Sequence, residues 1–365
     1  MYRHDIQTPA LLVNKTIVAS NIQRWQNHAS AHGVALRPHI KTHKSIELAT
    51  MQRDAGAQGI TAAKLSEATV FVDAGFSDVF VAYPIIGRTK CAIAAELARR
   101  CRLIVGVESA VAVQDLSHAA VAAGVTIAVR IEVESGLQRC GAAPESVLAL
   151  AQTVLAAPGL TLDGIFTYRG AWFATANGQA PSALGRAEGE LMVGLATQLR
   201  AAGIRIDAVS VGSTPTGWSA AQVPGVTEIR PGTYVYGDLM QLKAGSATDA
   251  DVALSILCTV ISRPSATTAT VDGGSKTFAG DISYEKAGLP GYATVVGGDG
   301  VLVRMSEEHG VIQFSQPSTL PVGSRLALRP IHVCTTVNLS DSAFFCDPDT
   351  NECIPFQIVA RGKRI

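Results

Sequence analysis

Two histidines and two lysines lie within the stretch RPHIKTHKS, residues 37–45. The preceding residues GVAL are typical of a strand, and side chains two apart on a strand share a face. If the strand continues, it presents one basic face, made of Arg37, His39, Lys41 and His43. Such a face repels itself in water unless an anionic partner binds there. We therefore interpret the stretch as part of a binding site rather than as a solvated charged surface.

Lys41 is the candidate nucleophile, because it lies at the predicted strand end behind an apolar residue, whereas Lys44 lies beyond that end. Two later segments, GSTPT (212–216) and RPGTY (230–234), offer glycines, hydroxyls and backbone N–H groups of the kind that cradle a phosphate. A reactive lysine opposite a phosphate cradle indicates pyridoxal 5'-phosphate, with Lys41 forming the Schiff base. The alternative is that Lys41 forms a salt bridge to an acidic residue of the fold.

A second candidate site lies in IHVCTTVNLSD, residues 331–341. His332 and Cys334 are two apart in a β-like context, so they share a face and could bind one divalent metal, since zinc accepts imidazole and thiolate. Two protein ligands leave positions for water or substrate, which suits a catalytic metal. The alternative is a buried cysteine beside a histidine whose hydrogen bonds are satisfied.

The elements that must position these residues alternate between β-rich runs and alanine-rich helical stretches from about residue 34 to 240. Eight candidate strands lie at VALRPHI, AQGITAA, SDVFVAY, RLIVGVE, VTIAVRIEV, LDGIFTY, DAVSVG and VTEIR. Most of the helical stretches end in glycine, as helix C-caps often do. The pattern predicts an α/β fold with a (β/α)8 barrel of the TIM type, whose active site lies where the strands end. The unusual polar segments follow those strand ends.

Beyond about residue 245 the pattern becomes mostly β. DVALSILCTVISRP, ATTATVDGG, GVLVRMSEEHGVIQF and SRLALRPIHVC alternate or are β-branched, with glycine and proline between them. We predict three parts: an N-terminal strand within 1–20 that joins the β domain, a cofactor-binding barrel over 21–245, and a β domain over 246–365 that carries the metal site.

The composition gives no indication of a nucleic-acid or membrane partner. Lys plus Arg and Asp plus Glu are equal at 30 each, and no apolar run is long enough to span a membrane. The start, MYRHDIQTPALLV, lacks the apolar core of a signal peptide, so a cytoplasmic protein is expected. The seven cysteines are scattered without CxxC, so we expect neither disulfides nor a zinc knuckle. No GxGxxG opens a helix and no GxxxxGK[ST] occurs, so nucleotide-binding motifs are missing.

Several motifs, in this order, resemble the D-threonine aldolase and D-serine dehydratase family of fold-type III pyridoxal-phosphate enzymes: TPALLVN, LRPHIKTHKS, GSTPT, EIRPGTYVYGD, SEEHG and HVCTTVNLSD. The resemblance spans nearly the whole chain, and RPHIKTHK and the late His-x-Cys are its most specific motifs. It implies an alanine-racemase-like barrel with a β domain. It also implies a homodimer that acts on a small D-amino acid, with the active site near the subunit interface.

The resemblance also implies roles for single residues. Lys41 resembles the Schiff-base lysine, and Arg139 in GLQRCG resembles the arginine that contacts the phenolic oxygen of the cofactor. The implied phosphate and ring contacts are Tyr168, Gly212, Ser213, Thr214, Gly232, Thr233 and Tyr234. The implied metal pair, for Mn, Zn, Mg or Co, is His332 and Cys334. Arg169 either binds a substrate carboxylate or forms a surface pair, and Arg230 receives no role, although it occupies the place of an arginine that faces the pyridine nitrogen in racemases.

The activity implied by the resemblance is metal-assisted lysis of a D-3-hydroxy amino acid. We expect the D-threonine aldolase reaction, which yields glycine and an aldehyde, because TVNL follows the metal pair; His43 or metal-bound hydroxide would be the base for the 3-hydroxyl. The alternative is dehydration of D-serine or D-3-hydroxyaspartate to a 2-oxo acid and ammonia, which the His-x-Cys pair favours. An amino-acid racemase would use the same lysine without a metal. A non-catalytic pyridoxal-phosphate carrier usually lacks the β domain.

Overall fold

The computed structural model describes residues 5–170, 178–347, 350 and 352–365. The chain divides into two compact units, each built from segments distant in sequence. The β unit comprises residues 1–22, 42–47 and 233–361, and the barrel unit comprises residues 23–41, 48–232 and 362–365. The domain boundaries expected at residues 20 and 245 stay a prediction.

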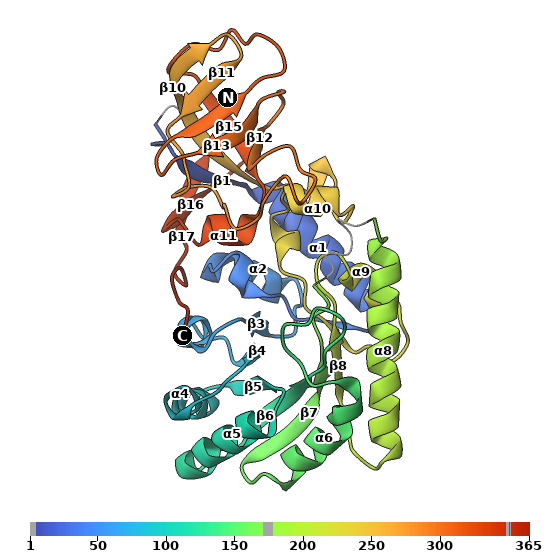
Figure 1. Ribbon diagram of the computed structural model, residues 1–365. Helices are drawn as coiled ribbons and strands as arrows, with labels where there is room; N and C mark the ends of the chain where they lie inside the picture. The colour runs from blue at the N-terminus through green and yellow to red at the C-terminus, as the bar shows by residue number, and fades with distance from the viewer. Residues whose placement is uncertain (1–4, 171–177, 348–349, 351) are drawn as a thin grey trace. The chain divides into compact units, whose positions relative to one another are not determined.

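The barrel unit is built on an eight-stranded parallel sheet (Figure 1). Its strands are β2 (Ala35–Leu36), β3 (Ile60–Ala62), β4 (Asp78–Pro84), β5 (Arg102–Val107), β6 (Ile127–Glu132), β7 (Leu160–Phe166), β8 (Ala208–Val211) and β9 (Glu228–Ile229). Hydrogen bonds from Gln58 N to Leu36 O and from Thr61 N to Pro38 O join the first strand segment to β3, so the sheet closes on itself. All eight predicted strands, and the predicted barrel fold, are confirmed.

Helices cover the outside of the barrel strands, as α4, α5, α6 and α8 show in Figure 1. The helices up to residue 232 are α1 (Lys15–Ala31), α2 (Ile46–Asp54), α3 (Leu65–Asp73), α4 (Arg88–Ala98), α5 (Ala110–Ala123), α6 (Val147–Ala156), α8 (Pro181–Ala201) and α9 (Gly217–Ala220), with 3-10 turns at Ile40–Thr42 and Pro144–Ser146. Helix α5 illustrates the local rules: the Ser109 side chain accepts the Ala112 N–H at its start, and Gly124 adopts φ +64° at its end. None of the described helices is long and apolar enough to cross a membrane.

Buried charges fill one layer inside the barrel. Nε of Arg37 lies 2.7 Å from Oε2 of Glu228, and Nη1 of Arg37 lies 2.6 Å from Oδ1 of Asp78. Arg130 donates to Glu228 and to Asp163 at 2.5 and 2.7 Å. Burial alone would raise the pKa of Glu228, but the two arginines hold it well below its ordinary range. The anionic partner expected for Arg37 is therefore a barrel acid and not a ligand.

The β unit contains a nine-stranded sheet. Its strands are β1 (Ala10–Asn14), β10 (Leu254–Ser265), β11 (Thr268–Val271), β12 (Ala293–Val295), β13 (Val301–Met305), β14 (Gly310–Gln313), β15 (Arg325–Pro330), β16 (Ser342–Cys346) and β17 (Cys353–Gln357). Strand β1 pairs antiparallel with β10 and parallel with β16. Short helices α10 (Leu239–Lys243) and α11 (Val333–Val337) and 3-10 turns at Thr233–Val235 and Asp249–Asp251 accompany the sheet.

The strand expected over residues 34–40 ends earlier than the sequence indicates. Strand β2 stops at Leu36, and a 3-10 turn occupies Ile40–Thr42. Ladder hydrogen bonds continue past Pro38, because the N–H of Arg37 donates to the Ile229 carbonyl and the N–H of His39 donates to the Pro231 carbonyl. Side chains two apart share a face only in extended backbone. The single basic face predicted for residues 37–43 is therefore wrong beyond His39, where the 3-10 turn begins.

The β-like context expected for the predicted metal pair is also wrong. His332 is the N-cap residue of α11, and Cys334 lies inside that helix. The first helical N–H, that of Val333, donates to Oδ2 of Asp238 at 2.9 Å, and the Thr336 hydroxyl donates to the His332 carbonyl. These capping bonds stabilise a helix in a β-branched segment that local preference alone assigns to a strand.

One disulfide contradicts the expectation from the scattered cysteines. Cys346 and Cys353 are bonded, with their Cα atoms 4.2 Å apart. They are directly paired residues of the β16–β17 hairpin. Cross-strand partners bring their side chains close whatever their distance along the chain, so sequence spacing was a poor guide here.

Candidate functional site

The residues predicted to bind the cofactor in the barrel unit follow the C-terminal ends of its strands. Arg139 follows β6, Tyr168 follows β7, residues 212–214 follow β8 and Gly232 follows β9. Lys41 follows β2 and lies in the 3-10 turn. Because the strands are parallel, these ends share one rim of the barrel, which is where active sites of such barrels lie.

Lys41 and Arg139 both approach the ring of Tyr168. Nζ of Lys41 lies 5.7 Å from the ring centroid, and Cζ of Arg139 lies 5.0 Å from it. Both distances are within the range in which a cation is attracted by an aromatic face. The fold thus brings together an amine, a guanidinium and a phenol ring that the sequence placed in three separate motifs.

Acidic side chains hold the loop that carries Arg139. The Glu134 carboxylate accepts the backbone N–H of Gln138 at 2.8 Å. Glu108, which follows β5, accepts the N–H of Gly141. Each carboxylate ties down a backbone group near Arg139, so the arginine is presented by a fixed loop rather than by a free one.

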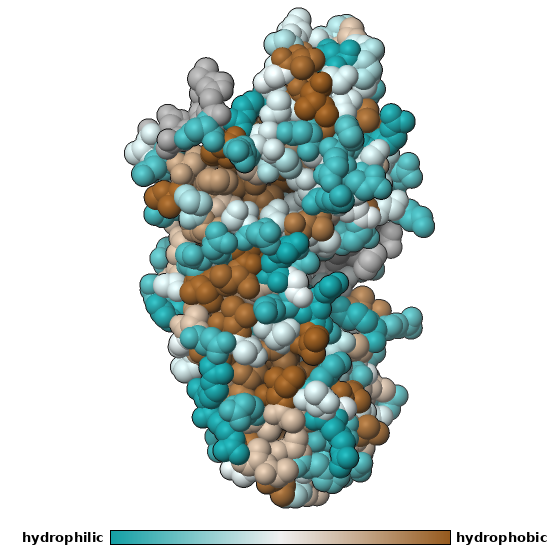
Figure 2. All heavy atoms as spheres, turned by 90° about the vertical axis from the view of Figure 1, so that its left-hand side faces the viewer, coloured by the Kyte–Doolittle hydropathy of each residue, from teal (hydrophilic) through white to brown (hydrophobic). Residues whose placement is uncertain are grey.

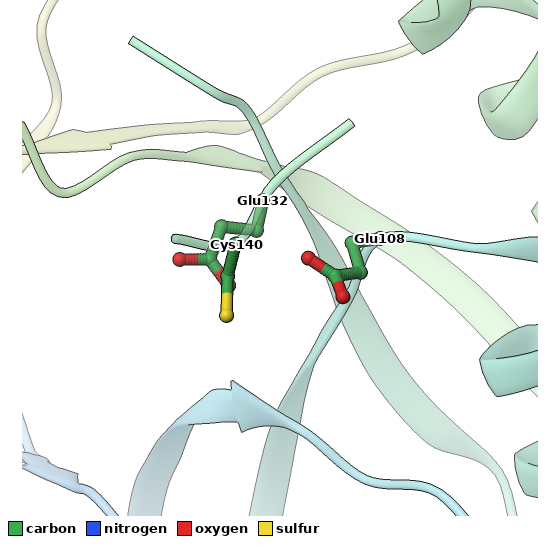
Figure 3. Close-up of side chains that lie close together, drawn as sticks. All are labelled: Glu108, Glu132 and Cys140. Carbon is green, nitrogen blue, oxygen red and sulfur yellow. The ribbon is translucent and has the colours of Figure 1, made fainter. Parts of the chain in front are cut away.

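Glu108, Glu132 and Cys140 point toward one another at the ends of β5 and β6, as Figure 3 shows. Their carboxylate oxygens and sulfur lie within 4.8 Å of one another. Burial raises the pKa of Glu132 to about 7, and Arg139 is the charge that most opposes this rise. We interpret this cluster as the acidic support of Arg139.

The loop GSTPT is stabilised by hydrogen bonds within the loop and by a hydrogen bond to helix α8. Ser213 N–H donates to the Thr216 hydroxyl at 3.0 Å, and Gly217 N–H donates to the Ser213 carbonyl at 2.7 Å. Gly212 adopts φ +81°, and its N–H donates to Oε1 of Glu188 on α8 at 3.1 Å. The N–H of Gly212 is therefore occupied by a protein carboxyl group, and the loop shape is what Gly212 contributes.

Arg230 is tied into the barrel strands. Its guanidinium donates to the Ser210 hydroxyl and, at 2.6 Å, to the Thr167 carbonyl. Burial lowers its pKa to about 10, although Glu228 opposes this effect. The absence of a cofactor role for Arg230 stays a prediction.

In the β unit, His332 and Cys334 do lie together, although on a helix rather than a strand. Nδ1 of His332 lies 2.8 Å from Oδ2 of Asp281, and the Thr335 hydroxyl donates to the same carboxylate oxygen at 3.0 Å. Burial alone would lower the pKa of His332, but Asp281 and the Cys334 sulfur outweigh burial and hold it well above its ordinary value. The surroundings of this imidazole therefore favour positive charge.

This arrangement fits a metal ligand pair. Ligating histidines usually give their second ring nitrogen to a carboxylate, which fixes the tautomer and the ring orientation. With Asp281 on Nδ1, the atoms of His332 and Cys334 that would bind a metal are Nε2 and Sγ. Imidazole nitrogen and thiolate sulfur suit zinc and other borderline divalent metals.

Three further predicted residues, Thr233, Tyr234 and His43, lie in the β unit. The Thr233 hydroxyl oxygen lies 3.9 Å from Sγ of Cys334, and Thr42 Oγ1 lies 3.3 Å from the same sulfur. Tyr234 is buried in the adjacent 3-10 turn. His43 is fully buried, and its Nδ1 accepts the backbone N–H of Ser45 at 3.2 Å.

Sequence reasoning missed the residues that support the site, namely Glu108, Glu132, Cys140, Glu188, Asp238 and Asp281. Glu108, Glu132 and Asp281 lie outside the motifs quoted above. Cys140 lies in GLQRCG and Asp238 ends EIRPGTYVYGD, so their motifs could have drawn attention to them. Glu188, between two glycines on the apolar side of a helix, was also a detectable signal.

Two sequence families match the chain in turn. Residues 13–240 match the alanine racemase N-terminal domain, and residues 253–346 match a putative serine dehydratase domain. A D-threonine aldolase of Arthrobacter sp is 32% identical over 98% of this chain and 93% of its own length. The crystal structure of a D-threonine aldolase from Filomicrobium marinum superposes with a TM-score of 0.91 at 30% identity, covering 99% of this chain and 97% of its own.

A D-threo-3-hydroxyaspartate dehydratase of Delftia sp. (strain HT23) is 35% identical over 91% of this chain and 92% of its own length. Its structure superposes with a TM-score of 0.89, covering 97% of both chains. In that enzyme a histidine and a cysteine two positions further on have each been replaced by alanine, and the cysteine variant is in the metal-free form. The spacing is that of His332 and Cys334.

Proposed function

We propose that the protein removes water from a D-3-hydroxy amino acid, with pyridoxal phosphate and a divalent metal as cofactors. The chain belongs to the family that joins an alanine racemase N-terminal domain to a serine dehydratase domain, and its relatives are lyases. The products would be a 2-oxo acid and ammonia. The observation that carries the proposal is the pair His332 and Cys334, with Asp281 bonded to Nδ1 of the histidine.

The rim of the barrel unit fits the organic cofactor. Lys41 would hold it covalently through its amine, Arg139 would donate to its phenolic oxygen, and Tyr168 would pack against its ring. The hydroxyls of Ser213 and Thr214 would bind its phosphate group, while Gly232, Thr233 and Tyr234 stay predicted contacts. The bound cofactor supplies an electron sink for the bonds at the substrate α-carbon. Lys41 would then carry the α-proton.

The metal would supply Lewis acidity toward the 3-hydroxyl group of the substrate. His332 and Cys334 would hold the ion, and Asp281 would orient the imidazole. A small number of protein ligands leaves room for a substrate oxygen. The metal-free form of the Delftia cysteine variant supports this assignment.

The state of His43 removes one of the two bases considered for aldol cleavage and leaves metal-bound hydroxide as the other. An imidazole whose Nδ1 accepts the Ser45 N–H carries its proton on Nε2 when it is neutral, so it offers a donor there and no free base. Aldol cleavage needs a base for the 3-hydroxyl proton, whereas dehydration needs one for the α-proton. Lys41 can be that second base, so dehydration requires nothing further from His43.

Aldol cleavage to glycine and an aldehyde, the reaction expected from the sequence, is the second candidate. It is supported by the TM-score of 0.91 to the Filomicrobium aldolase. A racemase reaction has weaker support, because it uses no metal and so leaves His332, Cys334 and Asp281 without a role.

The test is a product assay on purified protein with D-threonine and D-threo-3-hydroxyaspartate, before and after chelation. The proposal expects a 2-oxo acid and ammonia, lost with the chelator and restored by added divalent metal. Glycine with acetaldehyde from D-threonine would establish the aldolase instead. Metal-independent epimerisation would overturn both.

The homodimer implied by the sequence resemblance stays a prediction. Figure 2 shows apolar patches on one face of the molecule, separated by polar side chains. Patches of this kind are common at interfaces between protein chains, and light scattering of the purified protein would measure the assembly.

A further inference from the structure

Glu188 is a buried acid that the reaction does not use. It lies on α8 with 1% of its surface exposed. One carboxyl oxygen, Oε1, accepts the N–H of Gly212 at 3.1 Å. The other, Oε2, is buried without a hydrogen bond of good geometry among the described residues, although the Thr216 hydroxyl lies close enough to act on the pKa of the carboxyl group. A buried polar group of this kind is costly, so its retention calls for a reason.

The glycines around Glu188 allow α8 to approach the loop closely. A Cβ atom on Gly185 would lie 2.2 Å from the Thr216 carbonyl oxygen, and one on Gly189 would lie 2.8 Å from Cγ2 of Val223. Residues three and four apart on a helix share a face. Gly185, Glu188 and Gly189 therefore form one face that brings a single carboxyl group against the backbone of residues 212–216.

We infer that Glu188 is a positioning residue for the loop 212–216 and that it holds Gly212 in the conformation that admits the phosphate group of the cofactor. This inference rests on the proposed function, because it assumes that the loop binds that phosphate. Gly212 has φ +81°, and a Cβ atom there would lie 2.8 Å from Cα of Gly217. Only glycine fits this position, and glycine leaves the backbone free to adopt other conformations unless a neighbour such as Glu188 holds it.

Negative charge on a carboxyl group behind a phosphate site would weaken phosphate binding. Burial raises the pKa of Glu188, and the Thr216 hydroxyl and the Gly212 N–H oppose that rise only in part. The charges of Arg230 and Arg169 also act against it. A protonated carboxyl group still accepts the Gly212 N–H through its carbonyl oxygen. It does so without placing negative charge beside the ligand.

The experiment compares the binding of pyridoxal phosphate and of pyridoxal, which lacks the phosphate, to the full chain freed of cofactor. The dissociation constant of pyridoxal divided by that of pyridoxal phosphate isolates the contribution of the phosphate group to binding. Glu188→Ala should reduce this ratio at least about tenfold, which is the effect of losing one hydrogen bond between the loop and the charged phosphate group. Glu188→Gln keeps an acceptor for Gly212 without charge and should retain the wild-type ratio. Gly185→Ala should behave like Glu188→Ala, because it pushes α8 away from Thr216.

Met192 provides the matched control, because it is fully buried one turn further along the same helix. Met192→Ala should lower the melting temperature and leave the ratio unchanged. If Glu188→Ala weakens both ligands equally, in step with its loss of stability, the inference is overturned while the proposed function stands. If the wild-type chain shows no preference for pyridoxal phosphate over pyridoxal, both are overturned.

Discussion

The hydroxyl oxygen of Thr42 lies 3.3 Å from the sulfur of Cys334. Thr42 directly follows Lys41, so one peptide bond connects the proposed cofactor lysine to a residue that contacts the proposed metal ligand. The two motifs with the most chemistry, nearly 300 positions apart in the sequence, are linked through this residue.

Lys41→Ala should abolish turnover and the covalently held cofactor, because no other amine is placed to replace it in the proposal. The measurement is the absorbance of bound cofactor after borohydride reduction and denaturation. Lys44→Ala is the control. Nζ of Lys44 donates to the Ala360 carbonyl, so that variant should lose stability and keep the chromophore. Retention of the reduced adduct in the Lys41 variant would contradict the assignment.

Asp281→Asn should weaken metal binding by about 10–100-fold, because it removes the charge that orients His332. Activity should return when the metal concentration is raised, and pyridoxal phosphate binding should be unaffected. Metal titration of the chelated protein, read by activity and by metal content, measures the change. Asp299→Asn is the control, since Asp299 bonds Ser315 on the surface of the same unit. An unchanged metal affinity would show that Asp281 has no part in the site.

His43→Asn should leave dehydration within about tenfold of the wild-type rate, because the proposed chemistry takes no proton through His43. The asparagine side chain can still accept the Ser45 N–H that Nδ1 now accepts. Initial rates of 2-oxo acid formation would measure this. A fall of about 100-fold or more, with the fold intact by circular dichroism, would restore His43 as the base.

Glu132 should make the protein less stable as the pH rises. Its folded pKa is about 7, against an ordinary value of 4.5. Between these values the folded state keeps a proton that the unfolded state releases, so the free energy of unfolding falls with pH, by at most about 1.4 kcal/mol per pH unit. Urea denaturation at pH 5 and pH 8 should show that Glu132→Gln loses this decline. Glu190→Gln, exposed on α8, should keep it.

Glu228→Gln should destabilise the protein by about 3–5 kcal/mol, because it leaves Arg37 and Arg130 buried without their shared anion. Thermal unfolding monitored by circular dichroism is the measurement. Asp207→Asn removes an exposed partner of Arg205 and should cost no more than about 1 kcal/mol. Equal losses of stability in the two variants would show that Arg37 and Arg130 do not depend on the negative charge of Glu228.

The barrel could be predicted from the sequence because each of its strands is a compact run of β-branched residues bounded by glycine and followed by an alanine-rich helix. That signal is local, and local preference agrees with the fold. It failed at His332, where a β-branched segment forms a helix because Asp238, distant in sequence, caps it. It also failed at Lys41, which lies in a 3-10 turn rather than in the expected extension of the strand.

The residues of the candidate site also fall into two classes, those that the sequence identifies and those that it does not. Residues that act on a ligand, such as Lys41, Arg139 and His332, lie in motifs with unusual composition, so the sequence identifies them. Residues that hold them, such as Glu132 and Asp281, are ordinary acids whose meaning depends on a neighbour brought in by the fold. The disulfide between Cys346 and Cys353 belongs to this second class, because the register of a hairpin creates it.

Strand β1 has a consequence for how the protein is made. Leu12 pairs with Phe344, and Leu11 pairs with Ile256, so the strand leaves the ribosome long before either partner exists. Meanwhile the barrel segments can complete their own sheet. An apolar, unpaired strand on a nascent chain can associate with other chains. Biosynthesis should therefore depend on a chaperone that shields the first residues, and premature termination before β16 should yield an aggregating product rather than a smaller folded one.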